Sequence, residues 1–263
     1  MKVFYSNFKI LLFVSLFLAS ACQESTAPEP KSRVVVAIDA TFIPMSFMNT
    51  ENQLDGFEVD LIKEVAQEAN LKYELVNVEW GGLFGGLITG KFDLVISSVG
   101  IIEERKKRMA FSIPYMQSGA SILVRNNMTD IKSLEDLEEQ NATVGAQINT
   151  TSHYFLEKYS GIKIKTFEKF GHAVIDLANK GVDAVVGDSV QANYYFRKKG
   201  LEGQARFVGS RMTSEFYGIV LRKEDKELKD KIDVSLRRLL KNGTISRLHK
   251  KWELGELATV PDI

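Results

Sequence analysis

The sequence has a single cysteine, Cys22, in 263 residues. One cysteine cannot form an internal disulfide, so the stability of the folded part must come from packing. Histidine is also scarce: His153, His172 and His249 are the only three, and they show no His-Glu-x-x-His or other zinc spacing. We therefore expect neither a metal ion nor a cofactor.

Long apolar runs are missing as well. The apolar stretch Ile10 to Leu18 is shorter than the roughly 18 to 20 residues that a helix needs to cross the hydrocarbon of a membrane. It follows Lys2 and Lys9 and ends at small residues, which is the layout of a signal peptide. We predict that residues 1–21 are a signal peptide and that the protein is exported.

An excess of charge of either sign is absent too. The whole chain has 34 basic and 34 acidic residues, and loss of Lys2 and Lys9 with the signal peptide leaves a net charge near −2. Binding to a phosphate backbone requires a concentrated positive face. We therefore expect no nucleic-acid partner.

Cys22 stands directly behind the predicted signal peptide. The sequence Leu-Ala-Ser-Ala-Cys that ends there resembles the bacterial lipobox, offset by one small residue. In lipoproteins this cysteine is acylated, and several acyl chains at about 0.8 kcal/mol per buried CH₂ make a lasting membrane anchor. The alternative is an ordinary cleaved signal with an incidental thiol. Because residues 23–31 are polar and contain Pro28 and Pro30, we predict a lipidated N-terminus and extended spacer over residues 22–32.

From Arg33 onward, short apolar runs alternate with amphipathic stretches, which is typical of βαβ units with a parallel sheet. The first set has predicted strands at 34–38, 73–78 and 93–97 and predicted helices at 57–70 and 82–89. The second set has predicted strands at 143–146, 163–167 and 183–186 and predicted helices at 151–159, 172–180 and 190–199. Each set is long enough to form a lobe with its own core.

Two extended segments, 121–124 and 217–221, are candidates for the connections between these sets. Two C-terminal helices, 226–241 and 244–252, present leucine and isoleucine on one face and should pack on the first lobe. We predict an α/β fold of two lobes, each a mainly parallel sheet flanked by helices, joined by two hinge strands. Lobe 1 comprises residues 33–122 and 217–263, and lobe 2 comprises residues 123–216.

Eight segments between Arg33 and Leu254 match one known pattern in the same order. They are Ala37–Pro44, Gly56–Leu61, Trp80 with Gly90–Asp93, Ser97–Arg105, Phe111–Tyr115, Thr143–Gln147 with Asn149–Thr151, Gly181–Asp188 and Tyr217–Val220. Together they resemble the bacterial extracellular solute-binding proteins of family 3, which serve amino-acid ABC transporters and have the type 2 periplasmic binding protein fold, cluster F. Each segment alone is a weak signal, but eight in register are a strong one.

The resemblance implies a monomeric solute-binding lipoprotein rather than an enzyme. Such a protein captures a small solute, here a free amino acid, between its lobes and delivers it to an ABC transporter permease. We accordingly expect it in the periplasm or at the outer cell surface, anchored to a membrane through lipid on Cys22.

Arg105 lies in the charge run 103–108, and such runs usually form a solvated helix face. In the family that the chain resembles, the arginine after the Ser-Ser stretch binds the ligand α-carboxylate, so the resemblance assigns this role to Arg105. A guanidinium offers a planar fork of donors that suits a carboxylate in a cleft with little water. The strand end with Ser98 and Gly100 is expected to complete the clamp.

Three further ligand residues are predicted where strands end in the second set. Thr150 and Thr151 precede a helix, so their hydroxyls and N–H groups could meet a carboxylate at the positive helix end, or they could simply cap the helix. Asp188 lies at the carboxyl edge of a strand, where open α/β sheets bind ligands. The resemblance assigns it the ligand α-ammonium group, with an N-cap role as the alternative.

Asp39, Phe42 and Trp80 are predicted to meet the ligand side chain. The resemblance places Phe42 and Trp80 as aromatic walls, which can sandwich a planar side chain or face a cation, although simple core packing would also explain both. Asp39 could meet the cationic side chain of a Lys, Arg or His ligand, or cap the next turn.

The sequence departs from the family pattern at three positions. Many members have a hydroxyl residue at the position of Gly100 and threonine at that of Ile102, so one side-chain hydrogen bond to the carboxylate is missing, a loss of about 0.5 to 3 kcal/mol. Asn149 replaces the usual turn glycine but tolerates a left-handed backbone. The ligand class is the property that these departures affect.

Two other functions fit the same fold. Cyclohexadienyl dehydratases share it and use a pocket carboxylate to expel water, for which Glu58, Asp39 and Asp188 are candidates. Alternatively, the closed protein could be recognised by a membrane receptor instead of a permease.

Overall fold

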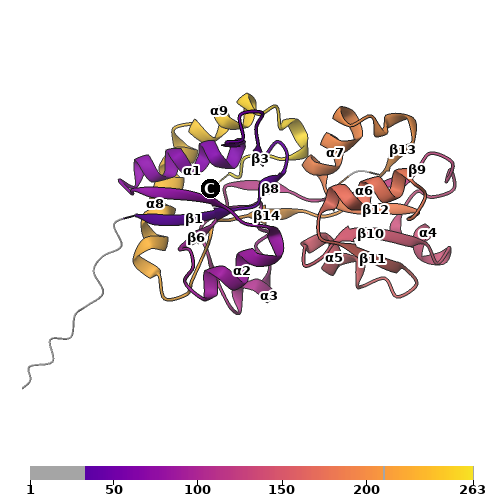
Figure 1. Cartoon of the computed structure of the whole chain (residues 1–263), viewed down its shortest axis with the longest axis horizontal. Helices are drawn as coiled ribbons and strands as arrows, with labels where there is room; N and C mark the ends of the chain where they lie inside the picture. Colours follow the sequence, from indigo (N-terminus) through magenta and orange to yellow (C-terminus); the bar gives the residue numbers. More distant parts are fainter. Residues whose placement is uncertain (1–32, 210, 263) are drawn as a thin grey trace, which may run out of the picture. The chain divides into compact units, whose positions relative to one another are not determined.

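The computed structural model describes residues 33–209 and 211–262. The predicted signal peptide, the predicted spacer and Cys22, the predicted lipidation site, lie outside the described residues. Two five-stranded sheets, each flanked by helices, build an α/β fold of two lobes, as predicted (Figure 1). Among the described residues, no helix is both long enough and apolar enough to cross a membrane.

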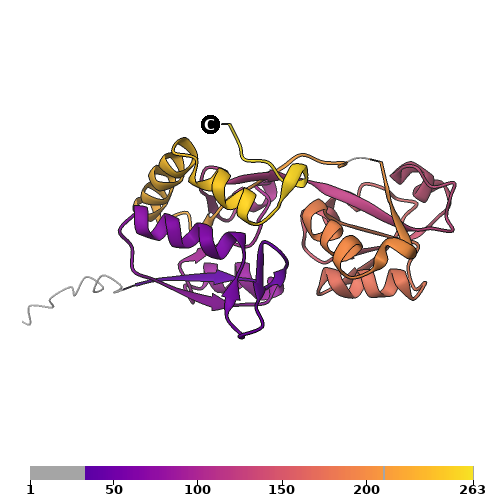
Figure 2. The same cartoon turned by 90° about the horizontal axis from the view of Figure 1, so that it is seen from above.

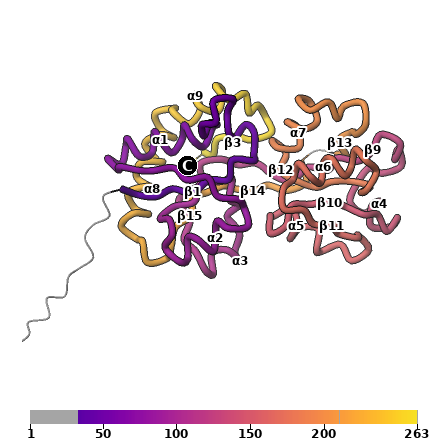
Figure 3. Tube along the Cα trace, in the orientation of Figure 1, coloured from indigo at the N-terminus to yellow at the C-terminus, as the bar shows by residue number. Residues whose placement is uncertain are grey.

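The first sheet has the strand order β5-β1-β6-β15-β7. These strands are Tyr73–Asn77, Val34–Ile38, Leu94–Val95, Val220–Leu221 and Ala110–Phe111. β1 pairs in parallel with β5 and β6, whereas β15 is antiparallel to β6 and β7. Segments from both halves of the chain therefore share one sheet, and Figure 3 traces their path from indigo through magenta to orange.

Helices cover both faces of the first sheet. On one face lie α1 (Phe57–Glu68), α8 (Lys226–Lys241) and α9 (Thr244–Lys251), and on the other lies α2 (Trp80–Ile88). Successive β1 residues alternate between the two cores: Val36 and Ile38 pack in the first, and Ala37 packs with the residues of α2. A strand buried on both faces is apolar throughout rather than alternating.

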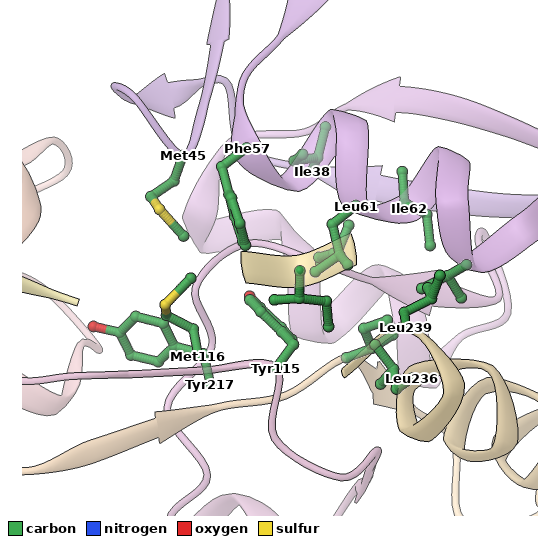
Figure 4. Packing of buried hydrophobic residues seen from close by; sticks show 14 of the residues in the cluster. Ile38, Met45, Phe57, Leu61, Ile62, Tyr115, Met116, Tyr217, Leu236 and Leu239 are labelled. Atoms are coloured by element: carbon green, nitrogen blue, oxygen red, sulfur yellow. The ribbon is translucent and has the colours of Figure 1, made fainter. Parts of the chain in front are cut away.

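The predicted packing of the C-terminal helices on this lobe is confirmed. Ile232, Leu236 and Leu239 of α8 belong to the core that contains Ile38 and Leu61 (Figure 4). Their spacing places them on one face of the helix. Burial of each such side chain contributes about 1.5 to 3 kcal/mol.

The second sheet has the order β11-β10-β12-β9-β13. These strands are Lys163–Phe167, Thr143–Gln147, Ala184–Asp188, Ala120–Arg125 and Ala205–Val208. The flanking helices are α4 (Leu134–Glu139), α5 (Thr151–Leu156), α6 (Phe170–Ala178) and α7 (Ser189–Lys198), with a short 3₁₀ helix at Leu201–Gly203 (Figure 2). β10 is parallel to β11 and β12, whereas β9 is antiparallel to both of its neighbours.

The connecting strands differ from the segments predicted for them. Residues 121–124 lie inside β9 as a buried strand of the second sheet. The strands that pair between the two sheets are β8 (Met116–Ser118) and β14 (Glu215–Tyr217), which are antiparallel. Of residues 217–221, the first ends β14 and the last two form β15 of the first sheet, so only Tyr217 belongs to the connecting pair.

Several short elements gave no sequence signal. The strands β2 (Thr41–Phe42), β3 (Ser46–Met48) and β4 (Leu54–Asp55) form a small third sheet. Helix α3 spans Glu103–Lys106, and a 3₁₀ turn at Gly255–Leu257 precedes the C-terminus.

Helix α2 begins at Trp80, two residues before its predicted start. Its first N–H group donates to the Asp39 carboxylate at 2.8 Å, so a side chain 41 residues away supplies the acceptor that a helix start requires. The glycine-rich stretch lies inside this helix. At Gly86 a larger residue would not fit. A Cβ there would lie 2.4 Å from the Phe92 ring.

Candidate functional site

One pocket collects all nine predicted ligand residues. They are Asp39, Phe42, Trp80, Ser98, Gly100, Arg105, Thr150, Thr151 and Asp188. The empty space among these residues is about 580 Å³, part of it open to solvent. Residues that the sequence did not single out also line it, namely Thr41, Ser97, Gln147, Ser152, Phe170, Val186, Gly187, Gln191 and Tyr217.

The pocket lies where strands of both sheets end. Asp39 follows β1, Ser98 lies just beyond β6, and Asp188 is the last residue of β12. Parallel strands bring their carboxyl ends to the same edge of a sheet, which is where α/β folds bind ligands. The strand-edge position was predicted from the local sequence for Asp188, whereas Asp39 and Ser98 were predicted from the family resemblance.

Arg105 is buried in this pocket, with 6% of its surface exposed. Its guanidinium donates to the Gly100 carbonyl at 3.0 Å and to the Asn149 carbonyl at 2.9 Å. It also lies 5.4 Å from the Trp80 ring and 5.1 Å from the Phe84 ring. Burial lowers the pKa of Arg105 to about 10, so the side chain stays cationic at neutral pH.

The rest of the charge run is solvated, as its sequence suggests. Lys106 and Lys107 form exposed ion pairs with Glu103 and Glu104 one turn earlier on the same helix. Arg105 alone of these charged residues is buried. The helix therefore separates one inward cation from a polar outer face.

Gly100 has no room for the side chain that relatives of this pattern place there. A Cβ would lie 2.7 Å from Cγ2 of Thr151 and 3.3 Å from Oε2 of Glu215. The Thr151 hydroxyl donates to the same Glu215 oxygen at 2.5 Å. Glu215 comes from β14, and nothing in its local sequence pointed to this pocket.

Thr150 is the N-cap of α5, so the capping alternative holds for this residue. Its hydroxyl oxygen accepts from the His153 N–H at 3.2 Å and donates to the Gln147 carbonyl at 2.8 Å. The preceding Asn149 has φ of 60°, in the left-handed region that the sequence predicted it to tolerate. This turn aims the Asn149 carbonyl at Arg105.

Asp188 combines an N-cap role with a place in the pocket. Its Oδ1 accepts from the N–H groups of Val190 at 2.8 Å and Gln191 at 3.4 Å, at the start of α7. Its Oδ2 accepts from the hydroxyls of Ser118, at 2.9 Å, and Tyr217. Removal of the carboxylate from water raises the pKa of Asp188 to about 6, against the opposing effect of the Tyr217 and Ser118 hydrogen bonds.

Asp39 has one satisfied and one unsatisfied oxygen. Oδ2 accepts from the Trp80 N–H, whereas the buried Oδ1 has no hydrogen-bond partner within the described residues. Burial raises the pKa of Asp39. A buried acceptor in a pocket wall calls for a donor from a bound molecule or water.

The two aromatic residues combine core packing with a place in the pocket wall. Trp80, the first residue of α2, packs in the core on one face of the first sheet, and Phe42 packs against the core on the other face, yet both line the pocket. The Trp80 indole N–H donates to the Ile148 carbonyl at 3.1 Å. This bond joins the two lobes across the pocket.

Further bonds cross between the lobes around the pocket. The Gln191 amide donates to the Thr41 carbonyl at 3.3 Å, and Lys169 pairs with Glu79 at 2.7 Å. Together with the bond from Arg105 to Asn149, they connect the two lobes around the pocket.

Glu58 lies behind the pocket rather than in its wall. It is fully buried, and one of its oxygens accepts from the Ser98 N–H at 2.5 Å, the Ser98 hydroxyl at 3.1 Å and the Tyr115 hydroxyl. Ser98 has φ of 47°, so these bonds hold a left-handed residue at the strand end. Glu58 therefore shapes the clamp from outside.

In the described part of the chain, no three His, Cys, Asp or Glu side chains gather in a group that could hold a metal ion. The chemistry that the pocket offers is that of one cation, two carboxylates, aromatic walls and backbone N–H groups. Such a set can bind a small zwitterion.

Comparisons with known proteins agree with this geometry. The profile of the bacterial extracellular solute-binding proteins, family 3, matches residues 34–256. The chain is 30% identical over 250 residues to a probable histidine-binding protein of Neisseria gonorrhoeae, with 92% of each chain covered. It is 36% identical to an ancestral arginine-binding protein solved with arginine, with a TM-score of 0.79 over 84% of this chain and 98% of that one. The ancestral amino-acid-binding protein AncCDT-1, a precursor of cyclohexadienyl dehydratase, is 37% identical, with a TM-score of 0.76 over 84% and 95%.

Proposed function

Since the chain belongs to the bacterial extracellular solute-binding proteins of family 3, we propose that it encloses a free amino acid between its lobes and delivers it to an ABC transporter permease. The observation that carries this proposal is the separation of charge in the pocket. Arg105 supplies a buried cation, and Asp188 and Asp39 supply carboxylates. A free amino acid carries the complementary carboxylate and ammonium groups.

The ligand α-carboxylate belongs at Arg105. The guanidinium has five N–H donors, and the Gly100 and Asn149 carbonyls occupy only part of them. The carboxylate can use the remaining donors or replace the Asn149 carbonyl. The N-terminal turn of α5, with Thr150 and Thr151, completes the anion site.

We propose a cationic side chain for the ligand. Once Asp188 has taken the α-ammonium group, the unpartnered oxygen of Asp39 remains, next to the aromatic faces of Phe42 and Trp80. The names of relatives support this class, because they include histidine-binding and arginine-binding proteins.

Binding and closure are one event in this proposal. The lobe built on the first sheet contributes Asp39 and Arg105, whereas the lobe built on the second sheet contributes Thr151 and Asp188. A ligand that touches both lobes stabilises the closed state through contacts that the open state lacks. Surfaces of the closed lobes would then be recognised by the permease.

We further propose that the protein is exported, lipidated at Cys22 and monomeric. These proposals are supported by the N-terminal sequence and by the family. Metabolic labelling with a radioactive fatty acid tests lipidation, and the label should be lost in Cys22→Ser.

An enzymatic function is the second candidate, favoured by the likeness to AncCDT-1 and by the raised pKa of Asp188. Incubation with arogenate or prephenate decides between solute binding and enzymatic dehydration. Formation of an aromatic product would show that the protein is an enzyme rather than a solute-binding protein.

A thermal-shift screen of the 20 amino acids, opines, polyamines and arogenate tests the proposed function directly. A ligand at 100 times its dissociation constant stabilises the folded state by about 2.7 kcal/mol. We expect the largest shifts with L-arginine, L-lysine or L-histidine. No shift with any amino acid would contradict the proposal.

Arg105→Ala should abolish detectable binding of the amino acid found in this screen. Loss of a bidentate charged contact in a cleft costs about 2 to 5 kcal/mol, a factor of at least about 30 in affinity. Isothermal titration calorimetry measures the affinity, and far-UV circular dichroism controls for folding. Lys106→Ala, on the exposed face of the same helix, is the matched control. Equal affinities of the two variants would contradict the proposed contact between Arg105 and the ligand α-carboxylate.

A further inference from the structure

The chain beyond α9 runs along the outer edge of β8. The N–H of Gln117 donates to the Thr259 carbonyl at 2.8 Å, and the Thr259 N–H donates to the Gln117 carbonyl at 2.7 Å. Successive strand residues direct their N–H and C=O groups to opposite edges. Gln117 therefore pairs with Thr259 while Met116 and Ser118 face β14. Residues 255–262 thus contact β8 through a single β-bridge at Thr259, on the edge opposite β14.

Ser118 links this C-terminal segment to the pocket. Its Oγ lies 2.9 Å from Oδ2 of Asp188 and 3.0 Å from the carbonyl oxygen of Leu257. A hydroxyl has one proton to donate, so these two acceptors compete for it. Ser118 itself is fully buried, so solvent does not supply an alternative partner.

Asp188 is held by both connecting strands through the same oxygen. Oδ2 accepts from Ser118 on β8 and from Tyr217 on β14, whereas Oδ1 is occupied by the start of α7. We assign a ligand ammonium group at Asp188 to Oδ2, because hydroxyl donors can turn away from it whereas the backbone donors on Oδ1 cannot. When the ammonium group donates to Oδ2, the carboxylate of Asp188 no longer requires both hydroxyl donors.

We propose that Ser118 couples occupancy of Asp188 to the orientation of the lobes, and that residues 255–262 are part of the hinge. This proposal rests on the proposed function in one respect, namely that the ligand has an ammonium group at Asp188. When that group takes Oδ2, the Ser118 hydroxyl turns to the Leu257 carbonyl and fastens the C-terminal segment to β8. Ser118 is thus a positioning residue that acts on the ligand through Asp188.

The first test needs no ligand. The carboxyl carbon of Asp188 is followed by ¹³C NMR against pH in the unsubstituted protein, in Ser118→Ala and in Ser214→Ala. The ionisable groups that act on Asp188 are Tyr217 and Glu215, both on β14, and both remain in all three proteins. Ser214 is the matched control, because it belongs to the crossing segment and bonds Gln117 at 2.6 Å without reaching Asp188.

We expect Ser118→Ala to move the titration midpoint of Asp188 to higher pH, because the ionised carboxylate loses a donor. Ser214→Ala should leave the midpoint in place. An unchanged midpoint in Ser118→Ala would show that the hydroxyl already resides on Leu257 in the empty protein, and the coupling would be overturned.

The second test uses L-arginine and 5-guanidinopentanoate, which is the same molecule without its α-amino group. Ser118→Ala and Thr259→Pro are compared with Thr259→Ala, which keeps the backbone N–H that donates to Gln117. The residue before position 259 is compatible with a following proline, because Ala258 has φ of −135° and ψ of 143°.

We expect Ser118→Ala and Thr259→Pro each to weaken L-arginine binding by about 3- to 10-fold, the effect of one lost hydrogen bond. Binding of 5-guanidinopentanoate and the affinity of Thr259→Ala should stay unchanged. Equal losses for both compounds would indicate a merely structural role and overturn the coupling. If the protein bound no amino acid at all, the proposed function would be overturned. The NMR titration alone would then test whether the Ser118 hydroxyl donates to Asp188.

Discussion

Asp188 has a pKa of about 6 because its carboxylate is removed from water, whereas an aspartate in an unfolded chain titrates near 3.8. Between these values the folded state holds a proton that the unfolded state has released. The free energy of unfolding of the empty protein should therefore fall as pH rises from 4 to 7, by at most about 3 kcal/mol from this residue. Urea unfolding at each pH measures the change, and Asp188→Asn should remove it.

Ligand affinity should show the opposite trend with pH, since an ammonium group requires the ionised form of Asp188. L-arginine binding should strengthen as pH rises from 5 to 7, with release of protons near pH 5.5. Calorimetry in two buffers of different ionisation enthalpy counts these protons. Proton uptake, or none, would mean that the ammonium group binds elsewhere.

Asp39 serves both as the acceptor at the start of α2 and as an unpartnered carboxylate, and substitutions can separate these roles. Asp39→Asn keeps an acceptor for the Trp80 N–H but loses the charge. We expect it to weaken L-arginine binding by at least about 10-fold at nearly unchanged stability. Asp39→Ala should in addition cost about 0.5 to 2 kcal/mol in thermal unfolding. If L-arginine bound to Asp39→Asn at full affinity, the cation would not be at Asp39.

At the scale of elements, the glycines of α2 provide a matched pair. A Cβ at Gly86 would lie 2.4 Å from the Phe92 ring, whereas one at Gly85 would meet nothing within 4 Å. Gly86→Ala should therefore destabilise the protein by about 1 to 3 kcal/mol through overpacking. Gly85→Ala should stabilise it by up to about 1 kcal/mol through helix propensity. Denaturation midpoints of the two variants that moved in the same direction would refute this packing argument.

Elements whose signal is local were predictable from the sequence. Helix α8 was predicted with its observed bounds, because Ile232, Leu236 and Leu239 recur at helical spacing. β9 was misplaced as a connection, since its burial between β12 and β13 depends on antiparallel pairing with distant segments. Periodicity reports that a run is buried but not which neighbours bury it.

The same distinction between local sequence signals and contacts with distant segments applies to the pocket residues. Asp188 and Thr150 were found because each ends or follows a strand, a property of the local sequence. Glu215 and Ser118 were missed because β14 and β8 bring them to Thr151 and Asp188 across 64 and 70 residues. Contacts of this separation are set by topology.

At the scale of the whole molecule, the ion pair between Glu79 and Lys169 joins the lobes outside the pocket. It links the starts of α2 and α6 at 2.7 Å, and the Glu79 side chain is 77% exposed. Exposed pairs are weak and screened by salt. We therefore expect Lys169→Glu to weaken amino-acid binding only about 2- to 5-fold, at low ionic strength, through faster opening and dissociation.

The double exchange Glu79→Lys with Lys169→Glu should restore the affinity, because the pair is reversed rather than removed. Stopped-flow dissociation at low salt and at about 0.5 M salt measures both variants, since screening at the higher salt should remove the difference. Lys165→Glu is the charge control, because Lys165 pairs with Asp176 inside lobe 2. If the double exchange dissociated as fast as the single reversal at low salt, charge attraction between the lobes would play no part in closure.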